Sequence, residues 1–249
     1  MLVGLVSITF RELSPPEIIK MVSDAQLDCI EWGADIHCPP GDLDNAGNVA
    51  RLMDDNGLIT ISYGTYFHVV GKKNNNSFDD IVETALALKT DNIRVWTGDI
   101  SSKDADGEYW SRAVEETRRI ADLAAQNKIS ISFEYHHTTL SDCLDSTIRL
   151  LQDVDRENVF TYWQPQAYSE PNTNIWDISQ LVKIKKLKNL HVFSWEGWDK
   201  LPLEARSDNW ISYIKAASVC NPAILLEFVK EPAQFYLDAK HLISLRERG

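Results

Sequence analysis

The feature that most constrains the fold is an even alternation of short apolar segments with helical patterns along all 249 residues. The apolar segments are rich in Ile, Val, Leu and aromatic residues. They are mostly continuous rather than strictly alternating, which is typical of strands that are covered on both faces. Eight such segments occur, at residues 2–10, 27–32, 58–64, 92–96, 129–135, 158–163, 189–195 and 223–229.

Helix-start signals lie between these apolar segments. Ser14-Pro-Pro-Glu17 combines an N-cap serine, a proline at the first helical position and a glutamate at the third, which is a capping box. Glu231-Pro232, and Asp177 with Gln180, repeat parts of this signal. The chain is therefore expected to alternate strand and helix throughout.

Eight strands alternating with helices, without a linker or a low-complexity stretch, predict a (β/α)8 TIM barrel with residues 1–249 as a single domain. A doubly wound open sheet is the main competitor. No G-x-G-x-x-G or G-x-x-x-x-G-K-[ST] loop follows a strand, which argues against the nucleotide-binding version of that fold. Long loops at 33–42 and 68–77 follow strands, so we expect them at the C-terminal face, where such barrels keep their active sites.

The charge balance limits the classes of partner. The formal net charge is -12, which opposes binding to nucleic acids and to anionic membrane surfaces. The four cysteines form no C-x-x-C pair, which is typical of reduced thiols in the cytosol. Arg11 and Glu12 follow the first apolar segment too soon for a signal peptide or a membrane span. We expect a cytoplasmic protein that acts on a small molecule, as a monomer or a homo-oligomer.

Four polar residues at consecutive strand ends could surround a divalent cation. Glu134, Gln164, His191 and Glu227 belong to the fifth to eighth predicted strands and offer two carboxylates, an amide oxygen and an imidazole. Such a set suits Mn²⁺ or Mg²⁺ at least as well as Zn²⁺. The alternative is that each glutamate pairs with a buried Arg or Lys, because an unpaired buried carboxylate is costly. Two glutamates with a histidine between them in strand order favour the metal site.

Other side chains near the same strand ends are candidates for substrate binding. They are Glu31, Trp32, His37, Tyr63, Arg94, Trp96, His136, Trp163 and Trp195. Indoles around one mouth could contact the C–H faces of a sugar, with ordinary packing as the alternative. His136 points to the same side of an extended chain as Glu134, and it either binds substrate or caps the next helix. Arg94 faces either a core carboxylate or the site, whereas His37 could equally be a surface residue and His68 belongs to an apparently solvated loop.

At these residues the chain resembles the xylose-isomerase-like TIM barrels, the sugar phosphate isomerase/epimerase superfamily. The resemblance covers nearly the whole chain and is carried by FEYHHTTL, LHVFSW and LLEFV, with TFREL, IEWGADIHCPPGD and IRVW in support. It implies one divalent metal held by Glu134, a residue after the sixth strand, His191 and Glu227. The aspartate that the family places after the sixth strand is missing from YWQPQAYSE, where Gln164 offers the oxygen.

The resemblance implies proton transfer next to a carbonyl. We expect a metal-dependent isomerase or epimerase of a sugar or sugar phosphate, in which Glu134 and Glu227 remove and return a proton through an enediolate. A metal-dependent dehydratase acting on a polyol or keto-sugar would use the same ligands. A sugar-binding barrel without catalysis is a further alternative. Abasic-site endonucleases share the fold, but the net charge argues against binding to DNA.

Overall fold

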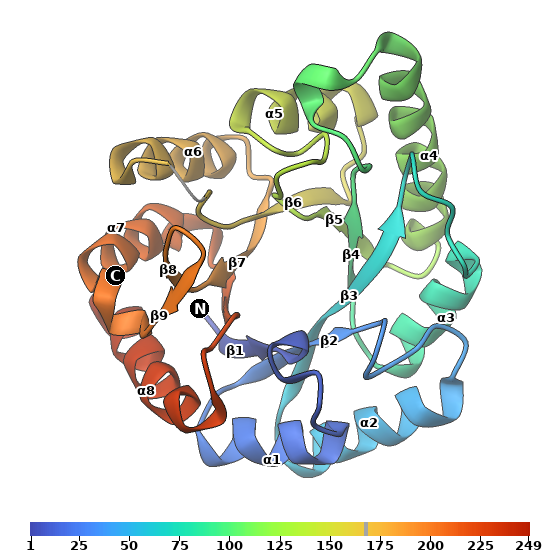
Figure 1. Ribbon diagram of the computed structural model, residues 1–249. Helices are drawn as coiled ribbons and strands as arrows, with labels where there is room; N and C mark the ends of the chain where they lie inside the picture. The colour runs from blue at the N-terminus through green and yellow to red at the C-terminus, as the bar shows by residue number, and fades with distance from the viewer. Residues whose placement is uncertain (167–168) are drawn as a thin grey trace.

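The computed structural model describes residues 1–166 and 169–249 of the chain. Within these residues, eight parallel strands close into a barrel in the order β1-β10-β7-β6-β5-β4-β3-β2, and eight α-helices surround it (Figure 1). The predicted (β/α)8 TIM barrel is confirmed. Among the described residues, each helix is too short or too polar to cross a membrane.

The strands and helices alternate along the chain as predicted. The barrel strands are β1 (Val3–Val6), β2 (Cys29–Gly33), β3 (Ile59–His68), β4 (Asn92–Trp96), β5 (Ser130–Phe133), β6 (Val159–Trp163), β7 (Leu187–Val192) and β10 (Ala223–Leu226). The helices are α1 (Pro15–Asp24), α2 (Leu43–Asp55), α3 (Phe78–Ala87), α4 (Gly107–Ala125), α5 (Leu144–Val154), α6 (Pro171–Lys183), α7 (Ser207–Ala217) and α8 (Pro232–Arg248).

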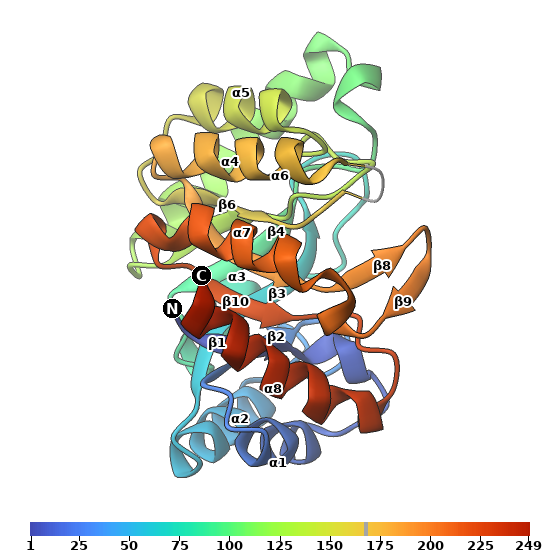
Figure 2. The same cartoon turned by 90° about the vertical axis from the view of Figure 1, so that its left-hand side faces the viewer.

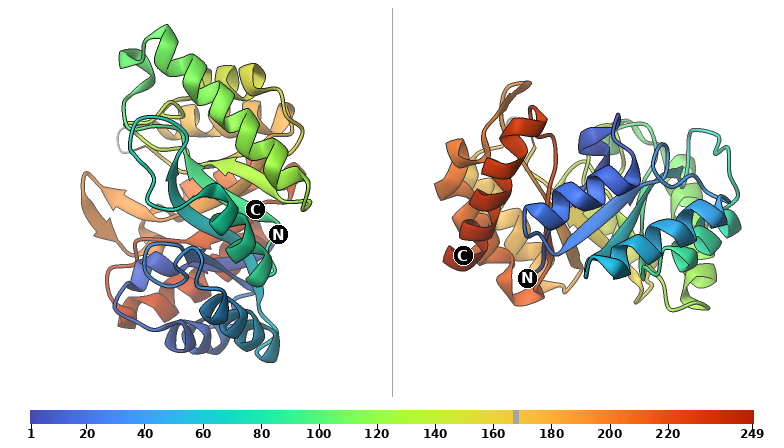
Figure 3. Two further views of the ribbon diagram at one scale, coloured as in Figure 1. Left: turned by 90° about the vertical axis from the view of Figure 1, so that its right-hand side faces the viewer. Right: turned by 90° about the horizontal axis from the view of Figure 1, so that it is seen from below.

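The predicted strand 189–195 is divided in the structure. β7 ends at Val192, and an antiparallel hairpin of β8 (Ser194–Glu196) and β9 (Asp199–Leu201) follows it. Its turn contains Gly197, whose φ of 59° a glycine accepts without steric cost. The hairpin projects from the end of the barrel opposite the two chain termini (Figures 2 and 3). It therefore lies at the C-terminal mouth.

Several other strand boundaries differ from the prediction, and β10, for example, ends at Leu226 instead of residue 229. The first strand ends at Val6, because residues 7–10 form the 3-10 helix η1 (Ser7–Phe10). β3 continues to His68, which still pairs with Trp96 of β4 after an irregularity in the register. The loop expected at 68–77 is correspondingly shorter.

The helix starts follow the predicted signals with one exception. The backbone N–H of Ser14 donates to Glu17 Oε2 at 2.8 Å, so the capping box of α1 is confirmed. α8 begins at Pro232 after its N-cap Glu231. The expected start near Asp177 is wrong, because α6 begins at Pro171 and Asp177 is a buried residue inside it.

The barrel interior contains a small apolar cluster and a polar layer. The apolar cluster consists of Val6, Cys29, Ala223 and Leu225. In the polar layer, Asn92 Nδ2 donates to Ser62 Oγ at 3.0 Å and to the Tyr162 hydroxyl at 2.9 Å. Ser132 donates to Asn92 Oδ1 at 2.7 Å, and Asn189 Nδ2 donates to the Tyr162 hydroxyl at 2.8 Å. Because these buried groups are mutually hydrogen-bonded, the layer is a fixed polar floor for the mouth of the barrel.

Gly64 makes room for charged side chains above this floor. A Cβ atom at Gly64 would lie 2.7 Å from Arg94 Nη2 and 2.7 Å from Glu31 Oε1. Both neighbouring residues are buried, so neither side chain can swing away into solvent. A side chain at position 64 would therefore have to displace part of the barrel interior.

We predict that Gly64→Ala lowers the free energy of unfolding by about 1–3 kcal/mol through this overlap. Gly47→Ala is the matched control, because Gly47 lies on α2 with no heavy atom within 4 Å of the added Cβ. There the gain in helix propensity should raise stability by up to about 1 kcal/mol. Urea unfolding of the two variants measures both effects, and equal stabilities would contradict the assigned crowding.

Candidate active site

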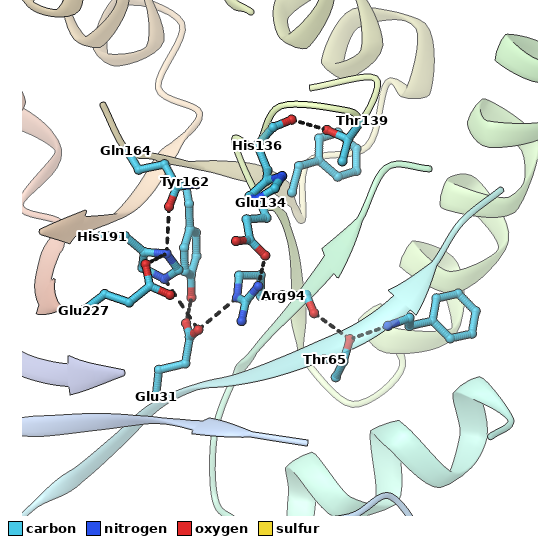
Figure 4. A network of polar contacts seen from close by, with 12 residues as sticks. Glu31, Thr65, Arg94, Glu134, His136, Thr139, Tyr162, Gln164, His191 and Glu227 are labelled. Atoms are coloured by element: carbon cyan, nitrogen blue, oxygen red, sulfur yellow. Dashed lines mark hydrogen bonds and ion pairs between the residues drawn. The ribbon is translucent and has the colours of Figure 1, made fainter. Parts of the chain in front are cut away.

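A buried arginine joins two glutamates at the C-terminal end of the barrel (Figure 4). Arg94 Nε on β4 donates to Glu31 Oε1 on β2 at 2.8 Å. Its Nη1 contacts Oε2 of Glu134, the residue that follows β5. Arg94 was expected either to pair with a buried carboxylate or to face the site. Its ion pair with the buried Glu31 is the first of these arrangements. Through Glu134, the same guanidinium also reaches a residue of the candidate site.

Glu31 lies at the centre of the charged cluster. Its Oε2 accepts a hydrogen bond from the Tyr162 hydroxyl at 2.8 Å, and its Oε1 lies 3.5 Å from His191 Nε2. Complete burial alone would raise the pKa of Glu31, but the charge of Arg94 and the contacts with His191 and Tyr162 lower it to about 2. Glu31 is thus charged at neutral pH and contacts Arg94, Tyr162 and His191 in that state.

The other half of the cluster surrounds His191 on β7. Its Nδ1 lies 3.2 Å from Gln164 Oε1 and 3.3 Å from Glu227 Oε2. The ring of Tyr162 stands edge-on to the imidazole at 5.1 Å, which limits its rotation. Burial alone would lower the pKa of His191, but the charge of Glu227 and contacts with Glu227 and Glu31 raise it to about 9. Without a cation, the imidazole would thus be protonated between two glutamates at neutral pH.

The contacts of His191 allow a test of whether a divalent cation fits. Glu227 Oε2 is buried without a hydrogen-bond partner in the described part of the chain, and so is His191 Nε2. A cation between Nδ1, Gln164 Oε1 and Glu227 Oε2 would satisfy the carboxylate. Nε2–H would then face Glu31, which is the common carboxylate–histidine–metal arrangement. This donor set fits a divalent cation, provided that the amide of Gln164 is a ligand.

The structure shows why Gln164 is essential to that fit. In the described part of the chain, no three His, Cys, Asp or Glu side chains lie together at metal-binding spacing. His191 and Glu227 supply only two donors of these types. Glu134, the expected fourth ligand, is turned towards Arg94. Its part in metal binding stays a prediction.

Aromatic rings line the mouth above the charged cluster. Trp96 follows Arg94 by two positions on β4, so it points to the same side of the strand. Its ring lies 4.6 Å from that of His136, between ring centroids. His136 Nδ1 lies 2.6 Å from the carbonyl oxygen of His137, and burial lowers the pKa of His136 to about 4. A neutral ring that donates from Nδ1 leaves Nε2 as a hydrogen-bond acceptor.

Two of the residues expected to bind substrate lie on the outer side of the barrel wall. Tyr63 alternates with the inward position of Gly64, and its hydroxyl donates to the carbonyl of Cys38 at 2.6 Å. Trp163 alternates with Tyr162 and packs against Tyr213 of α7, with ring centroids 5.3 Å apart. The strand pleat turns both rings towards the helices and away from the charged cluster. Their contact with substrate stays a prediction.

Trp32 and His37 are also displaced from the candidate site. Trp32 alternates with the inward-facing Glu31, and its ring packs against that of His37 at 6.0 Å. His37 Nδ1 lies 2.8 Å from Ser7 Oγ, and the ring is 3% exposed, so the surface interpretation is wrong as well. His68 is likewise buried, 8% exposed, although a solvated loop was expected. These residues support the loops rather than the charged cluster.

The sequence analysis did not identify the polar layer below the charged cluster, although the sequence contains a signal for it. Side chains two positions apart on a strand share a face. Four of the inward-facing candidates have a polar residue two positions earlier, and all four earlier residues are in the polar layer: Asn92, Ser132, Tyr162 and Asn189. Reading each strand backwards from its last polar residue would have found this layer.

Comparison with known proteins decides the family. The family described as "Xylose isomerase-like TIM barrel" matches residues 19–212. The chain belongs to this family. The expected resemblance is therefore confirmed.

The proteins similar to this chain include a dehydratase and epimerases. The chain is 37% identical over 72 residues to a 3-dehydroshikimate dehydratase of Bacillus anthracis, a match that spans 29% of this chain and 26% of the relative. The structure of the probable 3-DHS dehydratase of the same organism superposes with a TM-score of 0.78 at 19% identity, covering 98% of both chains. A D-allulose 3-epimerase from Methylomonas sp. superposes with a TM-score of 0.74 at 15% identity, covering 99% of this chain and 98% of that one. At such identities the structural matches show a shared fold.

The pKa of Glu31 generates a prediction for stability. A carboxylate with a lowered pKa stabilises the fold above the ordinary value of 4.5, and this contribution is lost as the pH falls towards 2. Glu31→Gln should lower the free energy of unfolding at pH 7 by about 3–5 kcal/mol, because it breaks a buried ion pair. The difference from the unmodified protein should shrink by about 1.4 kcal/mol per pH unit below pH 4.5.

Urea unfolding between pH 7 and pH 3 measures this difference. Glu83→Gln is the control, because Glu83 is an exposed glutamate on α3. Its curve should follow that of the unmodified protein at every pH. A Glu31→Gln difference that stays constant over the whole range would show that the charge of Glu31 does not stabilise the fold.

Proposed function

We propose that this chain is an enzyme that moves a proton next to the carbonyl group of a sugar or sugar derivative, as an isomerase or epimerase. The observation that carries the proposal is the placement of two buried glutamates, Glu134 and Glu227, at one mouth of the barrel. Each contacts a different side chain of the cluster, Arg94 for Glu134 and His191 for Glu227. Membership of the family supports carbohydrate chemistry at this end of the barrel.

Gln164, His191 and Glu227 would hold the divalent cation, Mn²⁺ or Mg²⁺ in preference to Zn²⁺ because most of the donors are oxygens. When bound, the cation supplies Lewis-acid stabilisation of negative charge on the substrate carbonyl oxygen. An amide ligand in place of a carboxylate leaves one negative charge fewer around the cation. We therefore propose a weakly held ion that chelators remove readily and Mn²⁺ or Mg²⁺ restores.

The two glutamates would carry the proton. One carboxylate takes the proton from the carbon next to the carbonyl, which leaves an enediolate. The other carboxyl group then donates a proton either to the opposite face of the same carbon or to the former carbonyl carbon, in the second case while the hydroxyl proton passes from one substrate oxygen to the other. The first outcome is epimerisation and the second is aldose–ketose isomerisation. Because Oε2 of Glu134 contacts Arg94, Oε1 is the oxygen available to the substrate.

His136 and Trp96 would orient the substrate. The neutral His136 ring can accept a hydrogen bond from a substrate hydroxyl at Nε2, because its Nδ1 faces the carbonyl of His137. The Trp96 indole beneath it offers an apolar face, and its Nε1 is buried without a partner in the described residues. Glu31 and Arg94, expected at first to bind substrate, are assigned instead to holding His191 and Glu134 in place.

A dehydratase is the second candidate, favoured by the 37% identity to a 3-dehydroshikimate dehydratase over 72 residues. The first step would be the same removal of a proton next to the carbonyl. The hydroxyl on the following carbon would then leave as water after it is protonated, which forms a double bond. The two candidates thus differ in the reaction of the enediolate, which is reprotonated by an isomerase or epimerase and loses water in a dehydratase.

Incubation in D₂O tests the shared step. We predict that D-psicose, D-tagatose or 3-dehydroshikimate acquires deuterium next to its carbonyl, as measured by NMR. An epimerised or isomerised sugar supports the first candidate, and a dehydrated product supports the second. Glu134→Gln and Glu227→Gln should each slow the exchange by about 10²–10⁴-fold, because general acid–base catalysis is lost.

Glu196→Gln is the matched control for these variants. Glu196 is an exposed glutamate on the hairpin at the same mouth, so its exchange rate should equal that of the unmodified protein. Exchange that persists in both catalytic variants would exclude the proposed roles of Glu134 and Glu227. Binding of a probe without any exchange would favour the non-catalytic sugar-binding alternative.

A further inference from the structure

The hairpin β8–β9 brings two tryptophans towards the segments that follow the two candidate catalytic glutamates. The ring centroid of Trp198, at the hairpin turn, lies 6.2 Å from that of His137, three positions after Glu134. The ring centroid of Trp195 lies 4.9 Å from that of Phe228, which directly follows Glu227. We name Trp195, Trp198, His137 and Phe228 the aromatic roof.

We propose that the aromatic roof binds the apolar C–H face of the substrate and holds it over Glu134 and Glu227, and that Trp198 is a specificity-determining residue. This inference rests on the proposed function. It assigns the substrate class as a polyhydroxylated molecule that presents one face of C–H groups. Trp198 was not among the residues that the sequence singled out.

The rings form a continuous series across the mouth. Trp195 and Trp198 lie 5.9 Å apart, and His137 is stacked on His136 at 4.1 Å. His136 in turn contacts Trp96, two positions after the buried Arg94 on β4. Aromatic faces in this arrangement offer a wide apolar surface with little conformational freedom to lose on binding.

The polar atoms of the series also point to a ligand. Trp195 Nε1 is buried and lacks a hydrogen-bond partner in the part of the chain that the structure describes, as does Trp96 Nε1. A buried N–H group without a partner is costly. Two substrate hydroxyl groups could accept from these indoles while the C–H face packs against the rings.

The backbone is strained at two residues in or next to the aromatic roof. Phe228 has a φ of 55° and Thr138, next to His137, has a φ of 61°. Residues with a Cβ atom rarely adopt this conformation, which persists only where the surroundings impose it. At Phe228 the packing against Phe193 and Trp195 supplies such surroundings. The strain turns the chain so that Glu227 is buried while the next ring faces the hairpin.

Trp198 offers a clean test because it is exposed. Its side chain is 66% exposed, so Trp198→Ala should fold normally and melt at the temperature of the unmodified protein. Trp176 on α6 is 60% exposed and is the matched control. Trp198→Phe keeps a ring at the mouth and serves as the conservative variant.

The experiment is a calorimetric titration of each variant with D-psicose and with 3-dehydroshikimate, followed by kinetics on whichever probe turns over. We expect Trp198→Ala to raise the dissociation constant and KM by about 2- to 10-fold, with kcat changed less than about twofold. Trp176→Ala should change neither value, and Trp198→Phe should restore most of the affinity.

Unchanged affinity in Trp198→Ala would overturn the inference, and so would failure of both probes to bind the unmodified protein. A lower kcat with unchanged affinity would overturn it too, because the ring would then act on the catalytic groups. Binding that depends on Trp198 but is not accompanied by proton exchange would uphold the aromatic roof and refute the proposed function. The two claims can thus fail separately.

Discussion

The buried ion pair between Glu31 and Arg94 is the interaction on which the candidate site depends. Glu31 contacts Arg94 at 2.8 Å and His191 at 3.5 Å, and each of these two side chains faces one of the two candidate catalytic glutamates. A buried charge without its partner would cost several kcal/mol, so the cluster is held as a unit. Gly64 leaves the space for it, and the Tyr162 hydroxyl ties it to the polar layer below.

The fold could be predicted because its signals are local and repeated. Continuous apolar runs indicated strands covered on both sides, and the capping box placed the start of α1. The hairpin β8–β9 was missed because residues 189–195 have the pattern of one continuous strand, whereas the turn that defines the hairpin, at Gly197, lies beyond the end of that segment. The start of α6 was misplaced because Asp177 has the chemistry of an N-cap but lies buried inside the helix.

The candidate site could be predicted only in part. Polar residues at strand ends located Glu134, Gln164, His191 and Glu227 at the correct end of the barrel. Strand ends alone do not say which face a side chain takes. Tyr63 and Trp163 each lie one position from an inward-facing residue, Gly64 and Tyr162, so the strand pleat turns both rings towards the helices. The pairing of Glu134 with Arg94 spans 40 residues of sequence, so it follows from barrel closure rather than from any local pattern.

The proposed chemistry requires that Gln164, His191 and Glu227 hold a divalent cation. Calorimetric titration of the metal-free protein with Mn²⁺, compared with Gln164→Glu, measures this. We expect one weakly bound ion per chain, and an affinity at least about tenfold higher in Gln164→Glu, because a carboxylate ligand replaces an amide. Absence of binding at millimolar Mn²⁺, or equal affinities of the two proteins, would contradict it.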